Sequence, residues 1–368
     1  MSFTRLLVLV QLLCLVHAST VLIDPDNAYI QYKGRVAANA DTNGAYNFDW
    51  PGVEIIIKVT GTSTIQGLVD SNVVQASGLP LFLGNITIFN VFVNGTLQSV
   101  LNVTSETKQT YNLFEDGLLN PSETCEVRLT KRTEACLGVV GFYGFIVDHT
   151  ATLVPPTEPP SRRLEFLGDS ITCGYGIIGM SPCPFTPETE NNYLTYGQLI
   201  ARELEADVNI EAWSGIGLVR NYGEPNISSV LAFPDVFPRT LATNPSLLWD
   251  FDSYQPNAVV INLGTNDFDS QPNPPADLFE QTYLQLIKTL NTVYPNQPKI
   301  FLVCGPMISG ACCDYVKSVA ESSDQLTYID LQNILEPSDI GCQGHPNISG
   351  HIKMSNISLP IIQKVMGW

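Results

Sequence analysis

The sequence predicts two domains: an all-β sandwich of jelly-roll type, followed by a three-layer α/β/α domain with a mainly parallel sheet. Three observations lead to this fold class. The first half carries short strand patterns and almost no helical periodicity. A proline-rich segment then interrupts the chain, and strands alternate with helices after it. The 368 residues are enough for two domains of ordinary size.

Residues 1–18 resemble a signal peptide. Arg5 provides the positive charge, an apolar run from Leu6 to Val16 follows, and Val16-His17-Ala18 forms a small-residue cleavage site. The run is too short to cross a bilayer, so we expect a secreted protein with no membrane partner. Cleavage removes one arginine and no acid, which changes the formal charge from −18 to −19. An acidic surface disfavours nucleic acid as a partner and suits a neutral polysaccharide.

Glycosylation sequons and cysteines agree with secretion. The six sequons, whose occupancy the sequence leaves open, are Asn85, Asn94, Asn102, Asn226, Asn347 and Asn356. Eight cysteines remain once Cys14 is cleaved, and an even number in an oxidising compartment indicates disulfides. The pairing stays ambiguous; the expected pairs, with Cys304 left as a buried thiol, are Cys125–Cys136, Cys173–Cys183 and Cys342 with Cys312 or Cys313. Paired Cys-x-x-Cys elements are missing, which disfavours a zinc site.

Residues 19–151 are expected to form the sandwich. The dipeptide Asn94-Gly95, between two apolar segments, is typical of a hairpin turn. The predicted strands are 53–59, 86–93, 97–103, 126–129 and 142–147. This half does not combine a nucleophile, a base and an oxyanion donor. We therefore interpret it as a packing partner for the second domain, in preference to a carbohydrate-contacting module.

Residues 152–162 contain four prolines and are expected to form a stiff, extended connector. Residues 163–368 are expected to form the α/β/α domain. Its predicted strands are 164–167, 208–213, 258–263, 299–304 and 327–331. Apolar side chains at helical spacing from Phe279 to Tyr294 predict one helix, and a last helix covers roughly 348–365.

Four short motifs stand next to these elements, three of them directly after strands. They are Gly168-Asp169-Ser170, Ala212-Trp213-Ser214-Gly215, Gly264-Thr265-Asn266-Asp267 and, before the last helix, Gly344-His345-Pro346. The carboxyl ends of parallel strands meet at one edge of the sheet, where open α/β sheets place their ligands. We therefore expect the four motifs to form one site.

Ser170 is the expected nucleophile, and its alternative is a turn and N-cap residue. A serine needs a base that removes its proton. Of the four histidines, His17 is cleaved off, His149 ends the β domain, and His351 lies inside the last predicted helix as a packing or surface residue. His345 is therefore the expected base.

The negative oxygen of a tetrahedral intermediate needs preorganised donors. We expect the backbone N–H groups of Ser170 and Gly215 and the side-chain amide of Asn266 to supply them, with Gly217 as the alternative to Gly215. Asp169 is expected to tie the turn by accepting backbone hydrogen bonds rather than to act as an acid.

In this order, the four motifs resemble the signature of the SGNH, or GDSL, hydrolases. Three further segments, 48–52, 128–134 and 171–176, resemble carbohydrate esterase family 2. Members of that family are acetylxylan esterase-like enzymes in which a jelly roll precedes the SGNH domain. The resemblance covers essentially the whole mature chain. It implies hydrolysis of O-acetyl esters on polysaccharides such as xylan or glucomannan, without a metal or organic cofactor.

One position departs from the SGNH signature. An aspartate usually stands three residues before the histidine and orients its imidazole. Here Cys342 occupies that position and the uncharged Gln343 follows. Some members of the resembled family also work with a Ser-His dyad and a backbone carbonyl. We expect a dyad of Ser170 and His345 with a carbonyl near Cys342, and Asp339 is the alternative.

The sequence thus predicts a secreted, monomeric serine esterase that deacetylates polysaccharide, while the polysaccharide and the hydroxyl stay open. One alternative is another SGNH esterase or lipase that acts on lipid or small esters. The other is a carbohydrate-binding protein with an inactive hydrolase domain. Trp213, Tyr175 and Tyr222 are candidates for a sugar-stacking face, although such aromatic residues more often belong to the core.

Overall fold

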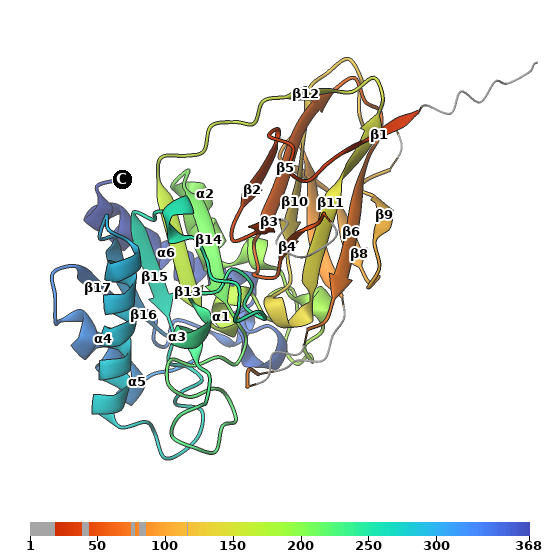
Figure 1. Cartoon of the computed structure of the whole chain (residues 1–368). Coiled ribbons are helices and arrows are strands. Elements are labelled where there is room, and N and C mark those ends of the chain that lie inside the picture. Colours follow the sequence, from red (N-terminus) through yellow and green to blue (C-terminus); the bar gives the residue numbers. More distant parts are fainter. Residues whose placement is uncertain (1–18, 39–43, 75–77, 81–85, 116) are drawn as a thin grey trace, which may run out of the picture.

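A computed structural model describes residues 19–38, 44–74, 78–80, 86–115 and 117–368. The ribbon divides into two domains, with a connecting segment at the top of the view (Figure 1). The expected signal peptide at 1–18 and the sequon at Asn85 lie outside the described residues. None of the helices in the described part of the chain is long and apolar enough to cross a membrane.

The N-terminal domain consists of two six-stranded antiparallel sheets. The first has the order β3-β4-β11-β6-β9, with β1 paired to β11; its strands are β1 (Thr20–Ile23), β3 (Ala37–Ala38), β4 (Tyr46–Phe48), β6 (Ile65–Asn72), β9 (Gln109–Asn112) and β11 (Val139–Asp148). The second has the order β12-β5-β10-β7-β8, with β2 on β5; its strands are β2 (Ile30–Lys33), β5 (Glu54–Thr60), β7 (Thr87–Val93), β8 (Thr96–Val103), β10 (Cys125–Lys131) and β12 (Thr152–Val154). Phe48 and Phe89, one from each sheet, meet edge to face in the core between them. This is the expected β-rich domain, and the jelly-roll topology remains a prediction.

The predicted hairpin turn connects β7 and β8. Asn94 and Gly95 both have positive φ, 48° and 77°, which a two-residue hairpin of this kind requires. Strand β7 is buried along its whole length, whereas buried and exposed residues should alternate along a strand whose sheet has one face in solvent. Its second face packs against the other domain, where Phe92 contacts Tyr193 and Asn90 bonds to Asn191.

The C-terminal domain contains the predicted parallel sheet, with the strand order β14-β13-β15-β16-β17. Its strands are β13 (Arg163–Gly168), β14 (Asp207–Ala212), β15 (Ala258–Asn262), β16 (Lys299–Cys304) and β17 (Leu326–Asp330). Successive residues of a strand point to opposite faces. Accordingly, Val260 belongs to one apolar cluster, whereas Val259 and Ile261 belong to another.

Helices cover both faces of this sheet. On one face α2 (Tyr196–Glu203) contacts α6 (Ile348–Met366), and on the other α4 (Ala276–Val293) contacts α5 (Ala311–Ala320). The short helices are α1 (Ser170–Cys173) and α3 (Phe233–Val236), and the 3₁₀ turns are Ala135–Leu137, Pro187–Thr189, Asn192–Leu194, Phe251–Ser253, Pro337–Asp339 and Cys342–Gly344. The three-layer arrangement is the one that the sequence predicts.

The connector is shorter than expected. Its first three residues, Thr152–Val154, form β12 and pair with β5, so they belong to the sandwich. The chain without regular structure runs from 155 to 162. The prolines begin at Pro155, and Thr-Leu-Val before them is a good strand sequence that retains its backbone donors.

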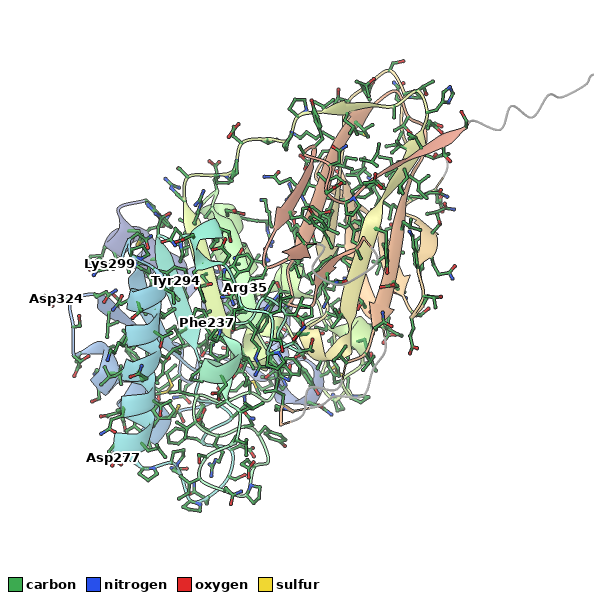
Figure 2. The ribbon with its side chains drawn as sticks, in the orientation of Figure 1. Arg35, Phe237, Asp277, Tyr294, Lys299 and Asp324 are labelled. Carbon is green, nitrogen blue, oxygen red and sulfur yellow. A yellow bond between two sulfur atoms is a disulfide. The ribbon has the colours of Figure 1, made fainter. Side chains whose placement is uncertain are left out.

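Buried polar contacts fix the two domains against each other. Arg35, which follows β2, is fully buried and forms ion pairs of 3.1 Å with Glu165 and 3.0 Å with Glu211, on neighbouring strands of the parallel sheet. Its guanidinium also lies 5.0 Å from the ring of Phe237, and both residues are seen beside Tyr294 in Figure 2. The carboxylate of Asp49 accepts the backbone N–H groups of Ala242 and Thr243 at 3.0 Å each. These buried contacts thus hold the sandwich domain against the second domain.

The disulfides differ from all the expected pairs. In the described part of the chain the bonds are Cys183–Cys342 and Cys304–Cys313, and Cys125, Cys173 and Cys312 are free thiols. Cys304 is therefore not the buried thiol that we expected. It ends β16, and α5 returns along the same strand, so Cys313 comes within reach. Cys342 pairs across 159 residues, a distance in sequence that spacing rules do not cover.

Candidate active site

A cavity of about 520 Å³ opens at the carboxyl edge of the parallel sheet. All four site residues expected from the sequence line it. The complete lining is Ser170, Tyr175, Gly215, Tyr222, Thr265, Asn266, Asp269, Met307, Ile308, Gln343 and His345. The structure thus brings the four motifs together where the parallel topology requires.

Ser170 begins α1 immediately after β13. Asp169 caps this helix, and its Oδ1 accepts the N–H of Ile171 at 3.0 Å. Gly168 allows the tight turn, because a Cβ there would lie 2.1 Å from Oγ1 of Thr172. The turn places the hydroxyl of Ser170 in the cavity.

His345 reaches Ser170 from the loop before α6. Its Nε2 lies 2.8 Å from Oγ of Ser170, and its Nδ1 lies 3.3 Å from the carbonyl oxygen of Gln343. A hydrogen on Nδ1 would be donated to this carbonyl, which leaves Nε2 as the acceptor of the serine hydroxyl. Burial lowers the pKa of His345 to about 4, so the imidazole is neutral at pH 7.

The loop that carries His345 is held at several points. The Cys183–Cys342 disulfide fixes it, the N–H of Cys342 donates to the carbonyl of Gly176 at 3.2 Å, and the N–H of Gln343 donates to that of Cys183 at 3.1 Å. Gln343 has a φ of 50°, a conformation that costs a non-glycine residue free energy. Its side chain accepts a hydrogen bond from the hydroxyl of Tyr175.

The carboxylate of Asp339 is directed away from this loop. It accepts the N–H of Glu336 at 2.8 Å, the hydroxyl of Ser349 at 2.7 Å and the ammonium of Lys353 at 2.5 Å. The hydrogen bond from Lys353 is the largest cause that lowers the pKa of Asp339 to about 2. None of these three partners of the Asp339 carboxylate is His345.

Two backbone N–H groups beside the serine are candidates for an oxyanion hole. Among the described residues, the N–H groups of Ser170 and Gly215 donate to no other residue, and both residues line the cavity. The N–H of Gly217, the alternative that the sequence left open, instead donates to Oδ1 of Asn221 at 3.0 Å. The geometry therefore favours Gly215.

Asn266 contributes an amide to the same place. Its Nδ2 donates to the carbonyl of Ile216 at 2.7 Å and, over a longer 3.3 Å, to Oδ2 of Asp169. The longer bond is the weaker one, so the hydrogen that makes it can be shared with a bound oxygen. Burial raises the pKa of Asp169 to about 7, and Asp169 has no contact with His345 that would make it the acid.

The remaining candidates have no assigned step in the reaction. His351 is buried in α6, where its Nδ1 accepts the N–H of Tyr196 at 3.2 Å. Trp213 is a core residue, whereas Tyr175 and Tyr222 both line the cavity. Tyr175 is buried, with its ring centroid 4.4 Å from that of His345, and Tyr222 is 60% exposed at the rim.

The sequence reasoning missed several lining residues. They are Asp269, Met307 and Ile308, whereas Thr265 belongs to one of the four motifs and Gln343 was noted only as the uncharged residue after Cys342. Met307 and Ile308 follow Cys304, the last residue of β16, so the rule that points to strand ends could have found them.

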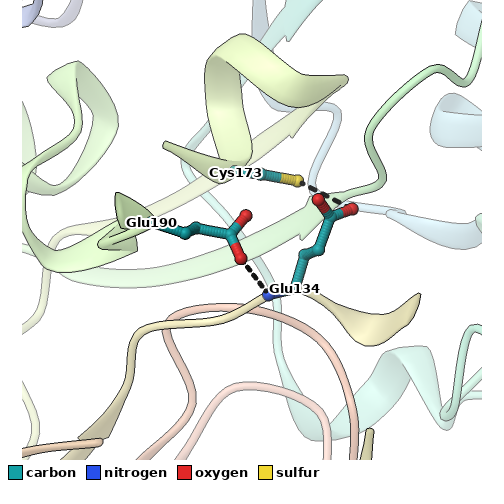
Figure 3. Close-up of side chains that lie close together, drawn as sticks. All are labelled: Glu134, Cys173 and Glu190. Atoms are coloured by element: carbon teal, nitrogen blue, oxygen red, sulfur yellow. Dashed lines mark hydrogen bonds between the residues drawn. The ribbon is translucent and has the colours of Figure 1, made fainter. Parts of the chain in front are cut away.

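A second cluster of polar side chains lies outside the lining of the cavity. Glu134, Cys173 and Glu190 are fully buried, and one ligand-type atom from each lies within 4.8 Å of the others (Figure 3). In the described part of the chain this is the group of side chains whose spacing could hold a metal ion.

The fold and the site have the features of the SGNH class of hydrolases, and comparison with known proteins agrees. Residues 32–159 match the family described as carbohydrate esterase 2 N-terminal, and residues 166–351 match the GDSL-like lipase/acylhydrolase family. Cellulase/esterase CelE of Acetivibrio thermocellus is 34% identical over 94% of this chain, which spans 40% of that relative's length. An acetylxylan esterase / glucomannan deacetylase of Cellvibrio japonicus is 28% identical, over 95% of this chain and 93% of its own length.

Solved structures give the same result. A family two carbohydrate esterase from Clostridium thermocellum in complex with cellohexaose matches with a TM-score of 0.80 and 33% identity, over 92% of this chain and 99% of that one. A family two carbohydrate esterase from Cellvibrio japonicus matches with a TM-score of 0.81 and 25% identity, over 95% and 99% of the two chains. The chain belongs to carbohydrate esterase family 2, within the GDSL hydrolases, and is a carboxylic ester hydrolase.

Proposed function

We propose that this protein is a secreted esterase that hydrolyses O-acetyl esters on polysaccharide, with Ser170 and His345 as a catalytic dyad. The observation that carries the proposal is the contact of 2.8 Å between Nε2 of His345 and Oγ of Ser170, in a cavity also lined by Gly215. The backbone N–H groups of Ser170 and Gly215 have no partner among the described residues. Such an arrangement is suited to acyl transfer from an ester to a serine.

In the first half of the reaction, His345 takes the proton of Ser170 as Oγ attacks the acetyl carbonyl carbon. The resulting oxyanion accepts hydrogen bonds from the N–H groups of Ser170 and Gly215 and from the amide of Asn266. Loss of one such donor typically costs about 10²–10³ in kcat. His345 then gives its proton to the departing sugar oxygen, which leaves an acetyl-serine.

In the second half, water replaces the sugar. His345 removes a proton from the water, which attacks the acetyl-serine, and the proton returns to Oγ as acetate leaves. The carbonyl of Gln343, 3.3 Å from Nδ1, keeps the ring in one orientation and favours the proton on Nδ1. It takes the place of the triad aspartate, although a neutral carbonyl stabilises the imidazolium less than a carboxylate does.

The substrate class is proposed from the relatives. Two of them are named acetylxylan esterase / glucomannan deacetylase, and one solved relative is in complex with cellohexaose. In this chain the exposed ring of Tyr222 at the rim is suited to stacking on a sugar ring. The extracellular location is likewise proposed from the signal-like segment 1–18 and from the two disulfides.

The experiment is a measurement of acetate release from acetylated xylan and acetylated glucomannan. Wild type is expected to release acetate and Ser170→Ala to release none above background. Acetate release that does not depend on Ser170 would refute the mechanism. Binding of either polysaccharide with no turnover by wild type would favour the carbohydrate-binding alternative, and turnover of long-chain lipid esters alone would favour the lipase alternative.

A further inference from the structure

A buried carboxyl group of the sandwich domain contacts both segments that carry the proposed oxyanion donors, one through a backbone N–H and the other through a thiol. Oε2 of Glu134 accepts the N–H of Ser214 at 2.7 Å and lies 3.7 Å from Sγ of Cys173 (Figure 3). Ser214 precedes Gly215 in the chain, and Cys173 ends the four-residue helix that Ser170 begins. Oε2 of Glu134 therefore contacts both the loop that contains Gly215 and the helix that begins at Ser170, which supply the two backbone N–H donors.

The geometry points to Glu134 as a positioning residue for the oxyanion hole, an inference that rests on the proposed function. By accepting the N–H of Ser214, Glu134 fixes the peptide plane next to the Gly215 N–H, and its contact with Cys173 ties this loop to the helix of the nucleophile. Glu134 does not touch the substrate, since it does not line the cavity. The sandwich domain is thus part of the catalytic machinery and does more than pack against it.

Neighbouring groups hold Glu134 in place. Its own N–H donates to Oε2 of Glu190 at 3.0 Å. The ammonium of Lys131, fully buried, donates to the carbonyls of Asp49 at 2.8 Å, Thr133 at 2.5 Å and Glu134 at 3.1 Å. The backbone of Glu134 is therefore held through its N–H group and through its carbonyl group.

A proton shared by the two carboxyl groups removes one negative charge from this buried cluster. Burial raises the pKa of both Glu134 and Glu190, and in Glu190 the negative charge of Glu134 raises it further. The side chains of the two glutamates hydrogen-bond to each other, which requires a proton on one of the two carboxyl groups. One carboxylate then remains on the glutamate pair, and the Lys131 ammonium, which also faces the buried carboxylate of Asp49, lies close enough to offset negative charge at both places.

A metal ion is the competing occupant, because two carboxylates and a thiol are common ligands. Two features argue against it. The Lys131 ammonium already supplies the positive charge of the cluster, and Oε2 of Glu134 already accepts the N–H of Ser214. A proton shared by the two glutamates explains their proximity and displaces neither the Lys131 ammonium nor the N–H of Ser214.

The test compares three substitutions of Glu134 in the full-length enzyme. Glu134→Gln keeps a carbonyl oxygen for the N–H of Ser214, and its amide hydrogens can replace the shared proton. Glu134→Met keeps the length but has no acceptor. Glu134→Asp keeps the charge, but its shorter side chain no longer reaches Ser214, and it serves if the methionine variant fails to fold. Glu123→Met, at an exposed position of the same domain, is the matched control.

Three readouts are compared: kcat and KM for 4-nitrophenyl acetate, and Ki for a trifluoromethyl ketone, whose adduct with a serine places an oxyanion in the hole. In Glu134→Met and Glu134→Asp, kcat is expected to fall roughly 10- to 100-fold and Ki to rise by a similar factor, with KM within about twofold. Glu134→Gln is expected to stay within about threefold of wild type, as is Glu123→Met.

The outcomes separate this inference from the function on which it rests. Hydrolysis by wild type that Ser170→Ala leaves intact would overturn the proposed function and the inference with it. Ser170-dependent hydrolysis with unchanged kcat and Ki in folded Glu134→Met or Glu134→Asp would overturn the inference alone. Equal losses in Glu134→Gln and Glu134→Met, or inactivation of wild type by a chelator, would also overturn it, because a metal ion would then be the better explanation.

Discussion

The disulfide between Cys183 and Cys342 joins the segment after the nucleophile's helix to the loop that carries His345. Cys342 stands three residues before His345, where SGNH hydrolases usually have an aspartate. The disulfide is reinforced by the N–H of Gln343, which donates to the carbonyl of Cys183 at 3.1 Å. A covalent bond thus restrains the loop at the position where the orienting carboxylate is missing.

Removal of this disulfide should impair both stability and turnover. For Cys183→Ser combined with Cys342→Ser, we expect a loss of about 2–4 kcal/mol in the free energy of unfolding, because the bond closes a loop of 159 residues. We also expect kcat to fall about tenfold or more, because the base is less well positioned. Urea denaturation and steady-state kinetics measure the two effects, and Cys125→Ser, which alters a free thiol of the sandwich, is the control. Normal kcat in the double variant would contradict the role given to the bond.

The pH dependence of turnover should follow His345. Only the neutral imidazole can accept the serine proton, and burial lowers its pKa to about 4. Raising the pH through this value creates the active form, so kcat/KM should rise to a plateau above about pH 5 and reach half of the plateau near pH 4. Hydrolysis of 4-nitrophenyl acetate, followed at the isosbestic wavelength of nitrophenol, measures the profile. Half-maximal activity at or above pH 6.5 would indicate that a carboxylate stabilises the imidazolium.

Arg35 should be essential for the stability of the two-domain unit. Substitution by methionine leaves Glu165 and Glu211 buried without their counter-charge, and breaking such a buried pair typically costs about 3–5 kcal/mol. Arg128→Met removes two ion pairs that are more exposed to solvent than those of Arg35. This substitution should cost about 1 kcal/mol or less. Urea unfolding of both variants makes the comparison. Similar stability of the two would show that the contacts of Arg35 do not hold the domains together.

The sequon at Asn347 should remain unoccupied when the protein is produced in a eukaryotic secretory host. Its Nδ2, the atom that a glycan would modify, donates to the carbonyl of Ser338 at 2.8 Å, and its Oδ1 caps α6 by accepting the N–H groups of Ser349 and Gly350. Glycopeptide mass spectrometry should find no glycan there, with exposed Asn102 as the comparison. Substitution of Asn347 by alanine should cost about 1 kcal/mol. A glycan at Asn347 would contradict this geometry.

Local pattern predicted the order of elements and the four site motifs. Strand and helix periods are local properties, and a parallel sheet brings the ends of its strands to one edge. This is why Ser170, Gly215 and Asn266 could be assigned to one site before the structure was known, and why β13 to β17 agree with the predicted strands within one or two residues.

Long-range geometry could not be predicted in this way. The pairing of Cys183 with Cys342 depends on two loops that approach each other only in the folded chain. The same holds for Glu134, whose partner Ser214 is 80 residues further along. A carbonyl near Cys342 was expected beside His345, but that it belongs to Gln343 depends on a backbone conformation, φ 50°, that residue type does not predict.

The kcat of Asp339→Asn tests the central claim, a dyad without a catalytic acid, most directly. In the structure the Asp339 carboxylate is bonded to Glu336, Ser349 and Lys353, so the substitution should leave kcat within about threefold of wild type. A fall of about 10⁴-fold, as occurs when the aspartate of a serine triad is replaced by asparagine, would contradict the account and make Asp339 the missing acid.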